Sequence, residues 1–442
     1  SRVGDGAVLL AGEALSVVTP GSRSGTRRGS EMDVSGSRVL LLIPAVTHRA
    51  TDFLVAAGRL GLDVVVGSDG ALPLGDRPVV HVDANDVGRS VDRLVSRSGP
   101  LDAVVAVDTP MLALAAAVAS RLGLPHNPVE AVIAANDKAE QRRLWLAAGV
   151  PQPSFRVVLA EAGERAITTA AAEVGFPCVV KAVSLSGSQG VLRADDEASA
   201  AAAARRIRGI LAEALRPDHE PLLVEAYVPG WEVSIDGLLT DGAVTVTAVF
   251  DKPDSPAGPT FEETILISPS RLPKRLLAAA AAVSEQAARG IGLRFGPIHA
   301  ELRMAPRDGR ETPTMLELAA RSIGGLCSRS LRFLDGVSLE EMVLANALGR
   351  PTAPVRAAGV VVGVFMLPVE RAGVLRMVEG RREAAAVPGI TGVSITLPVG
   401  QSVRPLPEGD RYLGFIFADG ESHAEVETAL RLARRRLRVV IE

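Results

Sequence analysis

From Arg38 onwards the sequence alternates short apolar segments with segments of helical pattern. The apolar segments read RVLLLI, LDVVVGS, PVVHVD and LDAVVAVD, and an alanine-rich helical stretch that ends at Leu122 follows the last of them. Strands and helices that alternate in this way predict a parallel sheet with helices on both faces. Residues 37–127 are therefore predicted to form a doubly wound α/β domain.

The turn after the first predicted strand limits what this domain can bind. Dinucleotide-binding domains place Gly-x-Gly-x-x-Gly at this turn, because glycine allows the backbone to approach the pyrophosphate closely. Here the turn reads IPAVTHRA, from Ile43 to Ala50, and contains no glycine. The sequence therefore argues against a dehydrogenase.

The rest of the chain differs in pattern from the first domain. From Asn136 the predicted strands have longer connections, which is typical of an α+β region, and we assign residues 128–350 to it. Further on, the apolar segments VVVGVFMLP, VSITLPV and YLGFIFA precede a helical segment from His423 to Leu437. Residues 351–442 are therefore predicted to form a mostly antiparallel β domain.

Two segments are predicted to lie outside the cores of these domains. Pro351 and Pro354 indicate a linker. Residues 1–36 are predicted to be a flexible leader, because the stretch from Gly21 to Ser30 is too polar and too rich in glycine to order by itself. The apolar sequence AVLLAGEALSVV within the leader is expected to form a short hairpin.

Composition restricts the class of protein. A chain of 442 residues is long enough for two to three domains with substantial cores. A net charge of −3 and a pI near 6.2 argue against a nucleic-acid-binding surface. Cys178 and Cys327 lie in apolar or glycine-rich surroundings, which indicates a reducing compartment and no disulfide framework. Without a bilayer-spanning run or a signal peptide in the sequence, we expect a cytoplasmic protein that binds no membrane.

Lysine is rare in this chain, and two lysines occupy informative positions. Only four lysines accompany 44 arginines. Lys181 ends the apolar strand Phe176–Val180, and Lys138 begins a predicted helix in the segment ANDKAEQRRLW. A compact ammonium is well suited to a single phosphate oxygen, whereas arginine presents a planar fork. Both lysines are therefore candidates for binding the phosphates of a nucleotide.

A loop rich in glycine and serine follows Lys181. The sequence SGSQG, from Ser186 to Gly190, contains two glycines and two hydroxyl groups. Such a loop can direct several backbone N–H groups at phosphate oxygens and can close over a ligand, so residues 184–190 are predicted to be a lid. The alternative is an ordinary turn between two strands.

The segment PLLVEAYVPGWEVSIDG has the features of a nucleoside-binding edge. A strand from Leu222 to Val224 leads to Glu225, and Glu232 follows seven positions later. An extended edge beside an apolar slot can pair with an adenine ring, and a nearby carboxylate can accept the two ribose hydroxyls. The alternative is a hairpin with exposed acidic side chains.

Two strands predicted near residue 310 carry acidic side chains within apolar sequence. In a strand, every second side chain lies on the same face. One face of the first strand is therefore predicted to carry His299, Glu301 and Arg303. One face of the second is predicted to carry Met315, Glu317 and Ala319. Carboxylates in such surroundings are costly unless a cation joins them. A magnesium ion bound to ATP phosphates meets this need with one or two protein carboxylates. Arg321 would then neutralise charge that develops on the reacting phosphate or acyl oxygen.

The alternative for the acidic pair is structural. Glu301 and Glu317 would then form salt bridges with Arg303 and Arg321, and no metal would be involved. The neighbouring glycine pair, Gly324 and Gly325, favours the metal site over this alternative.

With these residues the chain resembles the ATP-grasp superfamily. The resemblance extends from about Ser37 to Glu442 and is strongest to the carboxylate–amine ligases, in particular the bacterial L-amino acid ligases that make dipeptides. It implies an ATP-grasp fold, with the parallel N-terminal domain on one side and the antiparallel C-terminal domain on the other. It also implies ATP with Mg²⁺ or Mn²⁺, small-molecule carboxylate and amine substrates such as amino acids, and a homodimer as a common state among relatives.

The resemblance assigns roles to residues that match the family pattern. For ATP binding it implies Lys138, Lys181, Ser186, Gly187, Ser188, Gly190, Glu225, Ala226, Tyr227, Val228 and Glu232. It implies Glu301 and Glu317 as metal ligands, and Arg321 with Lys181 as catalytic residues. The residues expected to contact substrate are Asp108, Lys252, Glu263, His299, Arg321, Gly324 and Gly325.

Two positions depart from the family pattern. Asn is usual two residues after the second metal carboxylate, whereas this chain has Ala319, which leaves the number of bound metals open. Dipeptide-forming ligases tend to carry Glu-x-x-His before a proline in the substrate region, and here Glu263 is followed by Leu266 where the histidine would fall. The second departure indicates a less polar substrate.

Asp108 has two interpretations. It ends a predicted parallel strand, where ligands commonly bind, and so can hold an amino group. Because Thr109 and Pro110 follow it, Asp108 is equally suited to cap the next helix.

The activity implied by the resemblance is amide formation through an acyl phosphate, with release of ADP and phosphate. Two alternatives stay open at this level. One is another ATP-grasp enzyme, either a bicarbonate-using carboxylase or a ligase of the purine-pathway type. The other is a non-catalytic ATP-binding protein, which the absence of Asn at position 319 keeps in consideration.

Overall fold

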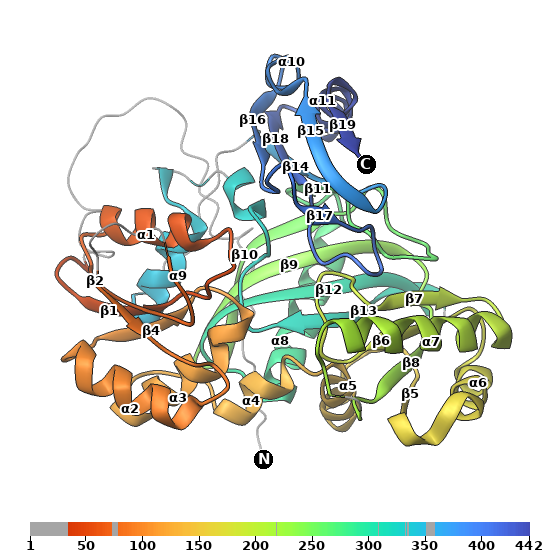
Figure 1. Ribbon diagram of the computed structural model, residues 1–442, viewed down its shortest axis with the longest axis horizontal. Coiled ribbons are helices and arrows are strands. Elements are labelled where there is room, and N and C mark those ends of the chain that lie inside the picture. Colours follow the sequence, from red (N-terminus) through yellow and green to blue (C-terminus); the bar gives the residue numbers. More distant parts are fainter. Residues whose placement is uncertain are drawn as a thin grey trace.

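The structure is a computed structural model that contains four β-sheets within the residues it describes (Figure 1). It describes residues 34–72, 78–217, 219–307, 309–331, 333, 336–350 and 359–442. The predicted linker prolines, Pro351 and Pro354, and all but the last three residues of the predicted leader lie outside the described residues.

The N-terminal sheet is parallel, as the alternation of its sequence predicts. Its strand order is β3-β2-β1-β4, with bounds Val79–His81, Asp63–Ser68, Arg38–Leu42 and Ala103–Ala106. Helices α2 (Val87–Ser98) and α3 (Leu112–Leu122) cover one face. Helix α1 (Ala50–Arg59) covers the other face together with α9 (Leu339–Ala347), a helix from far along the chain (Figure 1). The prediction of a doubly wound arrangement is confirmed.

A largely helical connection leads from this sheet to a second four-stranded sheet, called the small sheet to distinguish it from the eight-stranded one. The connection contains α4 (Val129–Ala134) and α5 (Lys138–Ala147). The small sheet is antiparallel with the order β5-β8-β6-β7, and its bounds are Phe155–Val158, Leu222–Ala226, Cys178–Ala182 and Val191–Ala194. Helices α6 (Gly163–Val174) and α7 (Glu197–Glu213) bury their alanine-rich faces against it.

The largest sheet has eight antiparallel strands in the order β13-β12-β9-β10-β11-β14-β18-β16. Their bounds are Arg310–Ala319, Gly296–Arg307, Trp231–Thr240, Ala243–Asp251, Ile265–Ser268, Val361–Leu367, Gly414–Gly420 and Ile390–Ile395. Helix α8 (Lys274–Ile291) packs on the β13 side of this sheet. Strand β11 pairs with β14, so the sheet continues without interruption into the predicted C-terminal domain.

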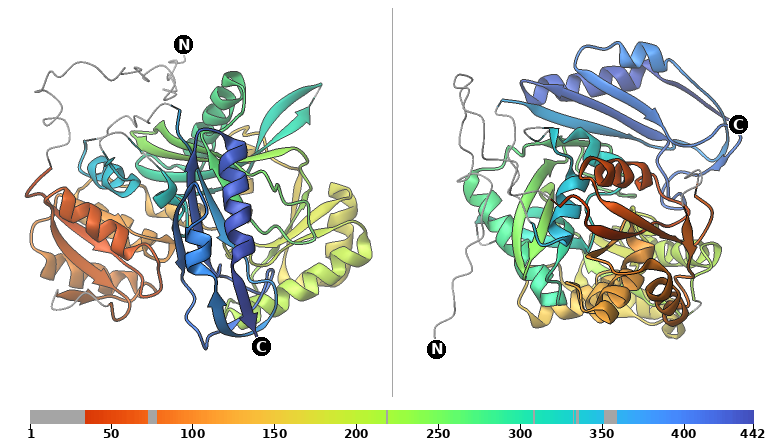
Figure 2. Two further views of the ribbon diagram at one scale, coloured as in Figure 1. Left: turned by 90° about the horizontal axis from the view of Figure 1, so that it is seen from above. Right: turned by 90° about the vertical axis from the view of Figure 1, so that its left-hand side faces the viewer.

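The C-terminal part adds elements that the sequence pattern did not indicate. A three-stranded sheet is formed by β17 (Ser402–Val403), β15 (Gly373–Glu379) and β19 (Arg438–Ile441), and α10 (Arg381–Ala385) follows β15. Helix α11 (His423–Arg436) lies along the C-terminal strands, as seen in both views of Figure 2. Its bounds agree with the predicted helix to within one residue.

The predicted orientation of one side chain in β13, that of Met315, is wrong. Strand β12 pairs Glu301 with Glu317 but Leu302 with Met315, so Leu316 is an extra residue that forms a β-bulge. The bulge turns Leu316 and Glu317 toward the same side, whereas Met315 is fully buried in the core beneath α8. Simple alternation had assigned Met315 and Glu317 to one face.

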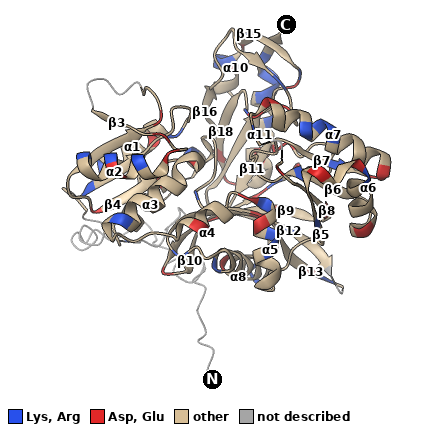
Figure 3. Ribbon diagram, turned by 60° about the horizontal axis from the view of Figure 1, so that its bottom comes forward, with Lys and Arg blue, Asp and Glu red and all other residues tan. Residues whose placement is uncertain are grey.

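Among the described residues, no helix combines the length and apolar character needed to cross a membrane. Basic and acidic residues are intermixed along the helices of Figure 3, in agreement with the small net charge.

Helix α5 depends on one large side chain for its position. Trp145 is fully buried between α5 and α8, and its indole N–H donates to the carbonyl oxygen of Ala287 at 3.0 Å. The Arg142 guanidinium lies over the same ring. Because Lys138 begins this helix, packing at Trp145 also holds Lys138 in place.

We expect Trp145→Ala to lower the free energy of unfolding by about 3–5 kcal/mol, since it creates a cavity in a closed core and leaves the Ala287 carbonyl without its partner. Urea and thermal unfolding midpoints measure the effect. Leu146→Ala is the matched control, because Leu146 is the next residue on the same helix and its side chain is 67% exposed. Equal midpoints for the two variants would contradict this account of how α5 is held.

Candidate active site

A cavity of about 350 Å³ lies between the small sheet and the eight-stranded sheet. The N-terminal sheet and a C-terminal loop, residues 404–412, also contribute to its walls. All but two of the residues singled out from the sequence line it. The exceptions are Gly190, at the end of the glycine-rich loop, and Lys252, which lies directly behind the wall.

The two predicted phosphate-binding lysines both point into the cavity, from different elements. Lys138 lies at the N-terminus of α5, and its Nζ donates to the Leu185 carbonyl at 2.5 Å and lies 3.1 Å from a Glu317 carboxylate oxygen. Lys181 lies in β6 and forms an ion pair with Glu225. Burial lowers the pKa of Lys181, although the Glu225 carboxylate opposes the shift.

Glu225 is held by a second cation that the sequence analysis missed. Arg142, fully buried in α5, donates from Nε to Glu225 at 2.9 Å and from Nη2 to the Leu316 carbonyl at 2.7 Å. Burial would raise the pKa of Glu225, but Arg142 and Lys181 lower it. The sequence contains no signal for it, because the buried face of α5 is mostly polar and nothing distinguishes Arg142 from the exposed Arg143 beside it.

The strand edge that follows Glu225 borders an apolar slot. Tyr227 donates its backbone N–H to Pro177, and Val228 accepts a hydrogen bond of 2.7 Å from Arg303. The slot is lined by Val179 of the small sheet and by Phe261 and Leu316 on the opposite side. This geometry is compatible with the predicted adenine site.

The glycine-rich loop is attached to the C-terminal loop. Gly187, Ser188 and Gly190 have φ near +60°, a conformation that glycine adopts without strain. The Gly190 N–H donates to the carbonyl oxygen of Pro407 at 3.0 Å, and Gln189 donates to the carbonyl oxygen of Glu408 at 2.9 Å. The Glu408 carboxylate accepts two hydrogen bonds, of 2.5 and 2.9 Å, from Arg206 in α7.

Three carboxylates surround Lys252. Its ammonium lies 2.7 Å from Glu232 and 3.4 Å from Glu301, and it also pairs with Glu263. Burial alone would lower the pKa of Lys252, but the three carboxylates raise it well above its usual range. These carboxylates could gather around a metal ion by distance alone. Because the Lys252 ammonium lies in contact with all three carboxylates, it would repel a metal ion bound by all three together.

Glu301 and Glu317 fit a cation better. They lie directly opposite each other on β12 and β13, and both line the cavity. Burial would raise the pKa of Glu301, but Lys252 and His299 hold it well below its usual range, so the carboxylate is ionised. Ala319 also lines the cavity and offers no ligand atom.

The alternative prediction, in which Glu301 and Glu317 form salt bridges with Arg303 and Arg321, is wrong. Arg303 pairs with Glu232 at 2.8 Å, and Arg321 lies 3.7 Å from Asp108. Glu317 pairs with Lys138 instead.

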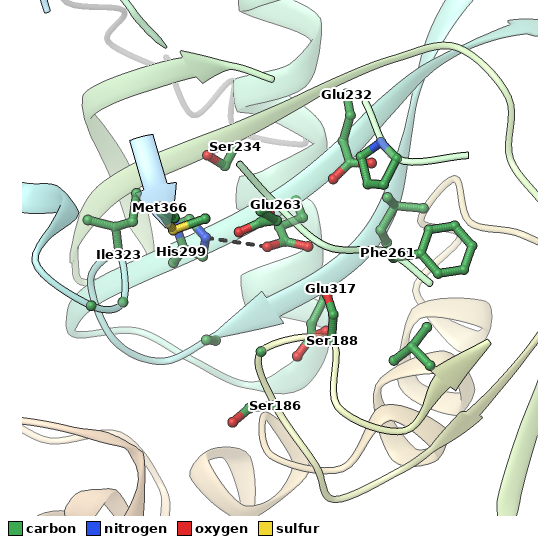
Figure 4. Close-up of a pocket in the computed structure, with 18 of the residues that line it drawn as sticks. Ser186, Ser188, Glu232, Ser234, Phe261, Glu263, His299, Glu317, Ile323 and Met366 are labelled. Atoms are coloured by element: carbon green, nitrogen blue, oxygen red, sulfur yellow. Dashed lines mark ion pairs between the residues drawn. The ribbon is translucent and has the colours of Figure 1, made fainter. Parts of the chain in front are cut away.

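His299 lies between two acidic side chains. Its Nδ1 is 3.3 Å from Asp236, and its Nε2 is 3.6 Å from Glu301, the ion pair that is dashed in Figure 4. Burial would lower the pKa of His299, but the carboxylates of Asp236 and Glu301 raise it to about 9. His299 is therefore a cation at neutral pH.

Arg321 and Asp108 meet where the N-terminal sheet reaches the cavity. Arg321 donates from Nε to the Thr109 hydroxyl and from Nη1 to the Ser322 carbonyl, both at 3.0 Å. Asp108 accepts from the Thr109 backbone N–H at 2.9 Å, so it caps the short helix that follows. Asp108 also lines the cavity, so both interpretations of this residue agree with its position.

Several residues of the cavity had no signal in the sequence. They come from the turn after β1, from strands β9, β14 and β18 of the large sheet, and from two loops, and they include His48, Ser234, Phe261, Met366, Asp410, Arg411, Tyr412 and Phe415. Ser234 belongs to the segment PLLVEAYVPGWEVSIDG, but nothing in the sequence distinguishes it there, and only the packing of distant segments brings the other residues into the cavity.

Comparison with protein families gives two matches. Residues 174–330 match the ATP-grasp domain, and residues 365–442 match the L-amino acid ligase C-terminal domain 2. Both matched segments contribute strands to the eight-stranded sheet and residues to the wall of the cavity.

Two characterised relatives are similar in sequence. A D-alanine–D-alanine ligase of Gloeobacter violaceus is 31% identical over 218 residues, which are 48% of this chain and 67% of that protein. The alanine–anticapsin ligase of Bacillus subtilis is 27% identical over 259 residues, which are 55% of this chain and 53% of that protein.

A solved structure shares the fold. The crystal structure of an L-amino acid ligase from Bacillus licheniformis matches with a TM-score of 0.72 at 24% identity, covering 92% of this chain and 100% of that one. The likeness extends over the three regions that surround the cavity.

The attachment of the glycine-rich loop leads to a prediction. We expect Glu408→Ala to increase hydrogen exchange at residues 184–190 by up to about fivefold, because a partly exposed ion pair contributes at most about 1 kcal/mol. Arg205→Ala is the control, since it removes an ion pair with Glu164 from the same helix without touching the C-terminal loop. Equal exchange in both variants would show that Arg206 and Glu408 do not hold the loop.

Proposed function

Because this chain belongs to the ATP-grasp ligase family, we propose that it activates a carboxylate with ATP and joins it to an amine. The product is a dipeptide or a related amide, and ADP and phosphate are released. The observation that carries the proposal is the meeting of Lys138, Lys181, the pair Glu301 and Glu317, and Arg321 around one cavity. The match of residues 365–442 to an L-amino acid ligase domain supports amino acids as substrates.

The roles of the binding residues follow from their positions. The adenine ring would lie in the slot between Val179 and Phe261, with Glu232 near the ribose. Lys138, Lys181 and the backbone of the glycine-rich loop would bind the phosphates. Glu301 and Glu317 would hold Mg²⁺ or Mn²⁺, which when bound neutralises the phosphate oxygens.

The first step joins the carboxylate to phosphate. An oxygen of the substrate carboxylate attacks the γ-phosphorus of ATP, the bond to the β,γ-bridging oxygen breaks, and its electron pair leaves with ADP. Arg321 lies where it can neutralise the charge on the acyl phosphate, while Lys138 and Lys181 keep the phosphate chain in line.

The second step forms the amide. The amine attacks the carbonyl carbon of the acyl phosphate, the bond from this carbon to the phosphate oxygen breaks, and the amine loses a proton. Water competes with the amine, because it hydrolyses acyl phosphates. The glycine-rich loop, attached to Pro407 and Glu408, would exclude water from the cavity during this step.

A second candidate function is ATP binding without catalysis. It is favoured by Ala319, which leaves one side-chain ligand fewer beside Glu317 than the family pattern has. Tight ATP binding with no phosphate release from any mixture of substrates would support it. A requirement for bicarbonate in ADP formation would instead indicate a carboxylase.

The proposed function is tested by phosphate release from MgATP with pools of amino acids, followed by mass spectrometry of the products. We expect release only with a carboxylate and an amine present, and a product mass equal to their sum minus water. Arg321→Ala should lower kcat by about 10²-fold or more while the Kd for ATP changes little, because its charge acts on the reacting centre. Turnover at the wild-type rate in this variant would refute the role of Arg321.

A separate prediction concerns the metal. Glu317→Gln should weaken ATP binding in the presence of Mg²⁺ by about tenfold or more, and binding without Mg²⁺ should change much less, because the carboxylate serves the cation. Calorimetric titration with and without Mg²⁺ measures both affinities. Unchanged Mg²⁺ dependence would mean that Glu317 serves only its ion pair with Lys138.

A further inference from the structure

One end of the cavity is apolar, in contrast to the charged end around Lys252 and the two phosphate-binding lysines. Its wall is formed by five side chains from four parts of the fold, which also belong to one hydrophobic cluster: Leu266, Ile323, Cys327, Met366 and Phe415. Each is at most 5% exposed, so the surface that they present faces only the cavity. In Figure 4, Ile323 and Met366 lie on one side of Glu263, and Phe261 of the adenine slot lies on the other.

The titratable group of this wall, the Cys327 thiol, and the phenol of Tyr412, which lies beside Phe415, are both uncharged. Burial raises the pKa of the Cys327 thiol far above neutrality, and burial together with the neighbouring Glu263 does the same for Tyr412. A ligand group at this end therefore meets hydrocarbon, a neutral thiol and aromatic rings. A charged group would lose its hydration there without meeting an opposite charge on any of these five side chains.

Strand pairing fixes Leu266 in this wall. Leu266 lies in β11 opposite Val364 of β14, and two residues further along β14 the Met366 N–H donates to the Thr264 carbonyl at 2.7 Å. Leu266 and Met366 are therefore presented by two paired strands and cannot move independently. This is the position where the family pattern led us to expect a histidine, so the chain replaces a polar group by hydrocarbon at a rigid site.

Two consecutive glycines join the apolar wall to Arg321. A Cβ placed on Gly324 would lie 3.4 Å from Arg321 Nη1, so this backbone lies against the guanidinium. A Cβ placed on Gly325 would lie 2.7 Å from the Phe415 ring, and Gly325 has a φ of +60°. The backbone that lies against Arg321 is therefore followed directly by the backbone that lies against Phe415 of the apolar wall.

One polar atom at this end has no partner. The Ser234 hydroxyl is completely buried and forms no hydrogen bond within the described structure, yet it lines the cavity. Ser234 lies in β9 directly opposite Glu301 of β12. Its hydroxyl is placed to bond a polar group of a ligand, such as the amino group or carboxylate next to an apolar side chain.

We infer that the substrate whose carboxylate is activated carries an apolar side chain, branched aliphatic or aromatic, which fills the subsite formed by Leu266, Ile323, Cys327, Met366 and Phe415. The inference rests on the proposed function and adds the chemical class of this substrate. An apolar side chain of leucine size should be preferred over a polar one of equal size by about 10- to 100-fold in kcat/KM, because it alone replaces water against this wall.

The test uses pairs of amino acids of nearly equal size as carboxylate donors, namely valine with threonine, leucine with asparagine, and phenylalanine with tyrosine. Amino acid amides serve as amines, since they have no free carboxylate to activate. Tandem mass spectrometry then identifies which component supplied the carbonyl group. We expect the apolar member of each pair to be the better donor.

Variants of one wall residue connect the preference to this site. Leu266→Asn should reduce the preference for leucine over asparagine as donor by about tenfold or more and leave the Kd for ATP unchanged. Leu266→Met keeps volume and apolarity and should retain the wild-type preference. Binding of 4-methylpentanoate and of the isosteric amide succinamate, measured by calorimetry with a non-hydrolysable ATP analogue, provides a readout that does not require turnover.

The outcomes separate the two levels of the proposal. Ligation with equal efficiency for apolar and polar donors, or calorimetric binding without preference, would overturn the apolar subsite and leave the ligase function standing. An unchanged preference in Leu266→Asn would also overturn it. Absence of phosphate release with every pair would overturn the ligase function, and the calorimetric comparison would still decide whether this end of the cavity binds apolar acids.

Discussion

The site depends on the electrostatic balance of carboxylates carried by strands β9, β12 and β13 of the large sheet and by the loop before β11. Glu301 and Glu317 face each other across β12 and β13, and Glu232 and Glu263 lie nearby. Such a concentration of negative charge is stable only where cations compensate it. Lys252 and His299 balance the negative charge of Glu301, and Lys138 balances that of Glu317 from the opposite wall. In the proposed function, a metal ion and the phosphates of ATP would join this arrangement of charges.

As a result, the chemical character of the cavity wall changes from one end of the cavity to the other. One end contains the ammonium groups of Lys138 and Lys181 and the glycine-rich loop, the middle contains the paired carboxylates and Arg321, and the other end contains hydrocarbon around Leu266 and Phe415. The continuous pairing of β11 with β14 makes this arrangement rigid across the predicted domain boundary. The C-terminal region therefore contributes walls to the cavity and, through Glu408, an attachment for the glycine-rich loop.

Much of this arrangement can be predicted from sequence, for reasons that differ between residues. The parallel domain follows from alternation alone, and Glu301 stands out because alternation predicts an acid among apolar neighbours. The bulge at Leu316 cannot be predicted, because a period-two pattern does not reveal one extra residue in one of two paired strands. Arg142 and the gathering of carboxylates around Lys252 depend on which strands and helices become neighbours in space. The roles assigned to individual site residues, and the division into domains, stay predictions.

The central claim is that a carboxylate oxygen attacks the γ-phosphorus of ATP, and isotope transfer tests it most directly. The donor is labelled with ¹⁸O in its carboxylate and incubated with the enzyme, MgATP and an amine, and the released phosphate is analysed by mass spectrometry. The account predicts one ¹⁸O atom in each phosphate released, because the phosphate departs with the oxygen that attacked it. Phosphate released without ¹⁸O, while ADP and amide form, would contradict the acyl phosphate route.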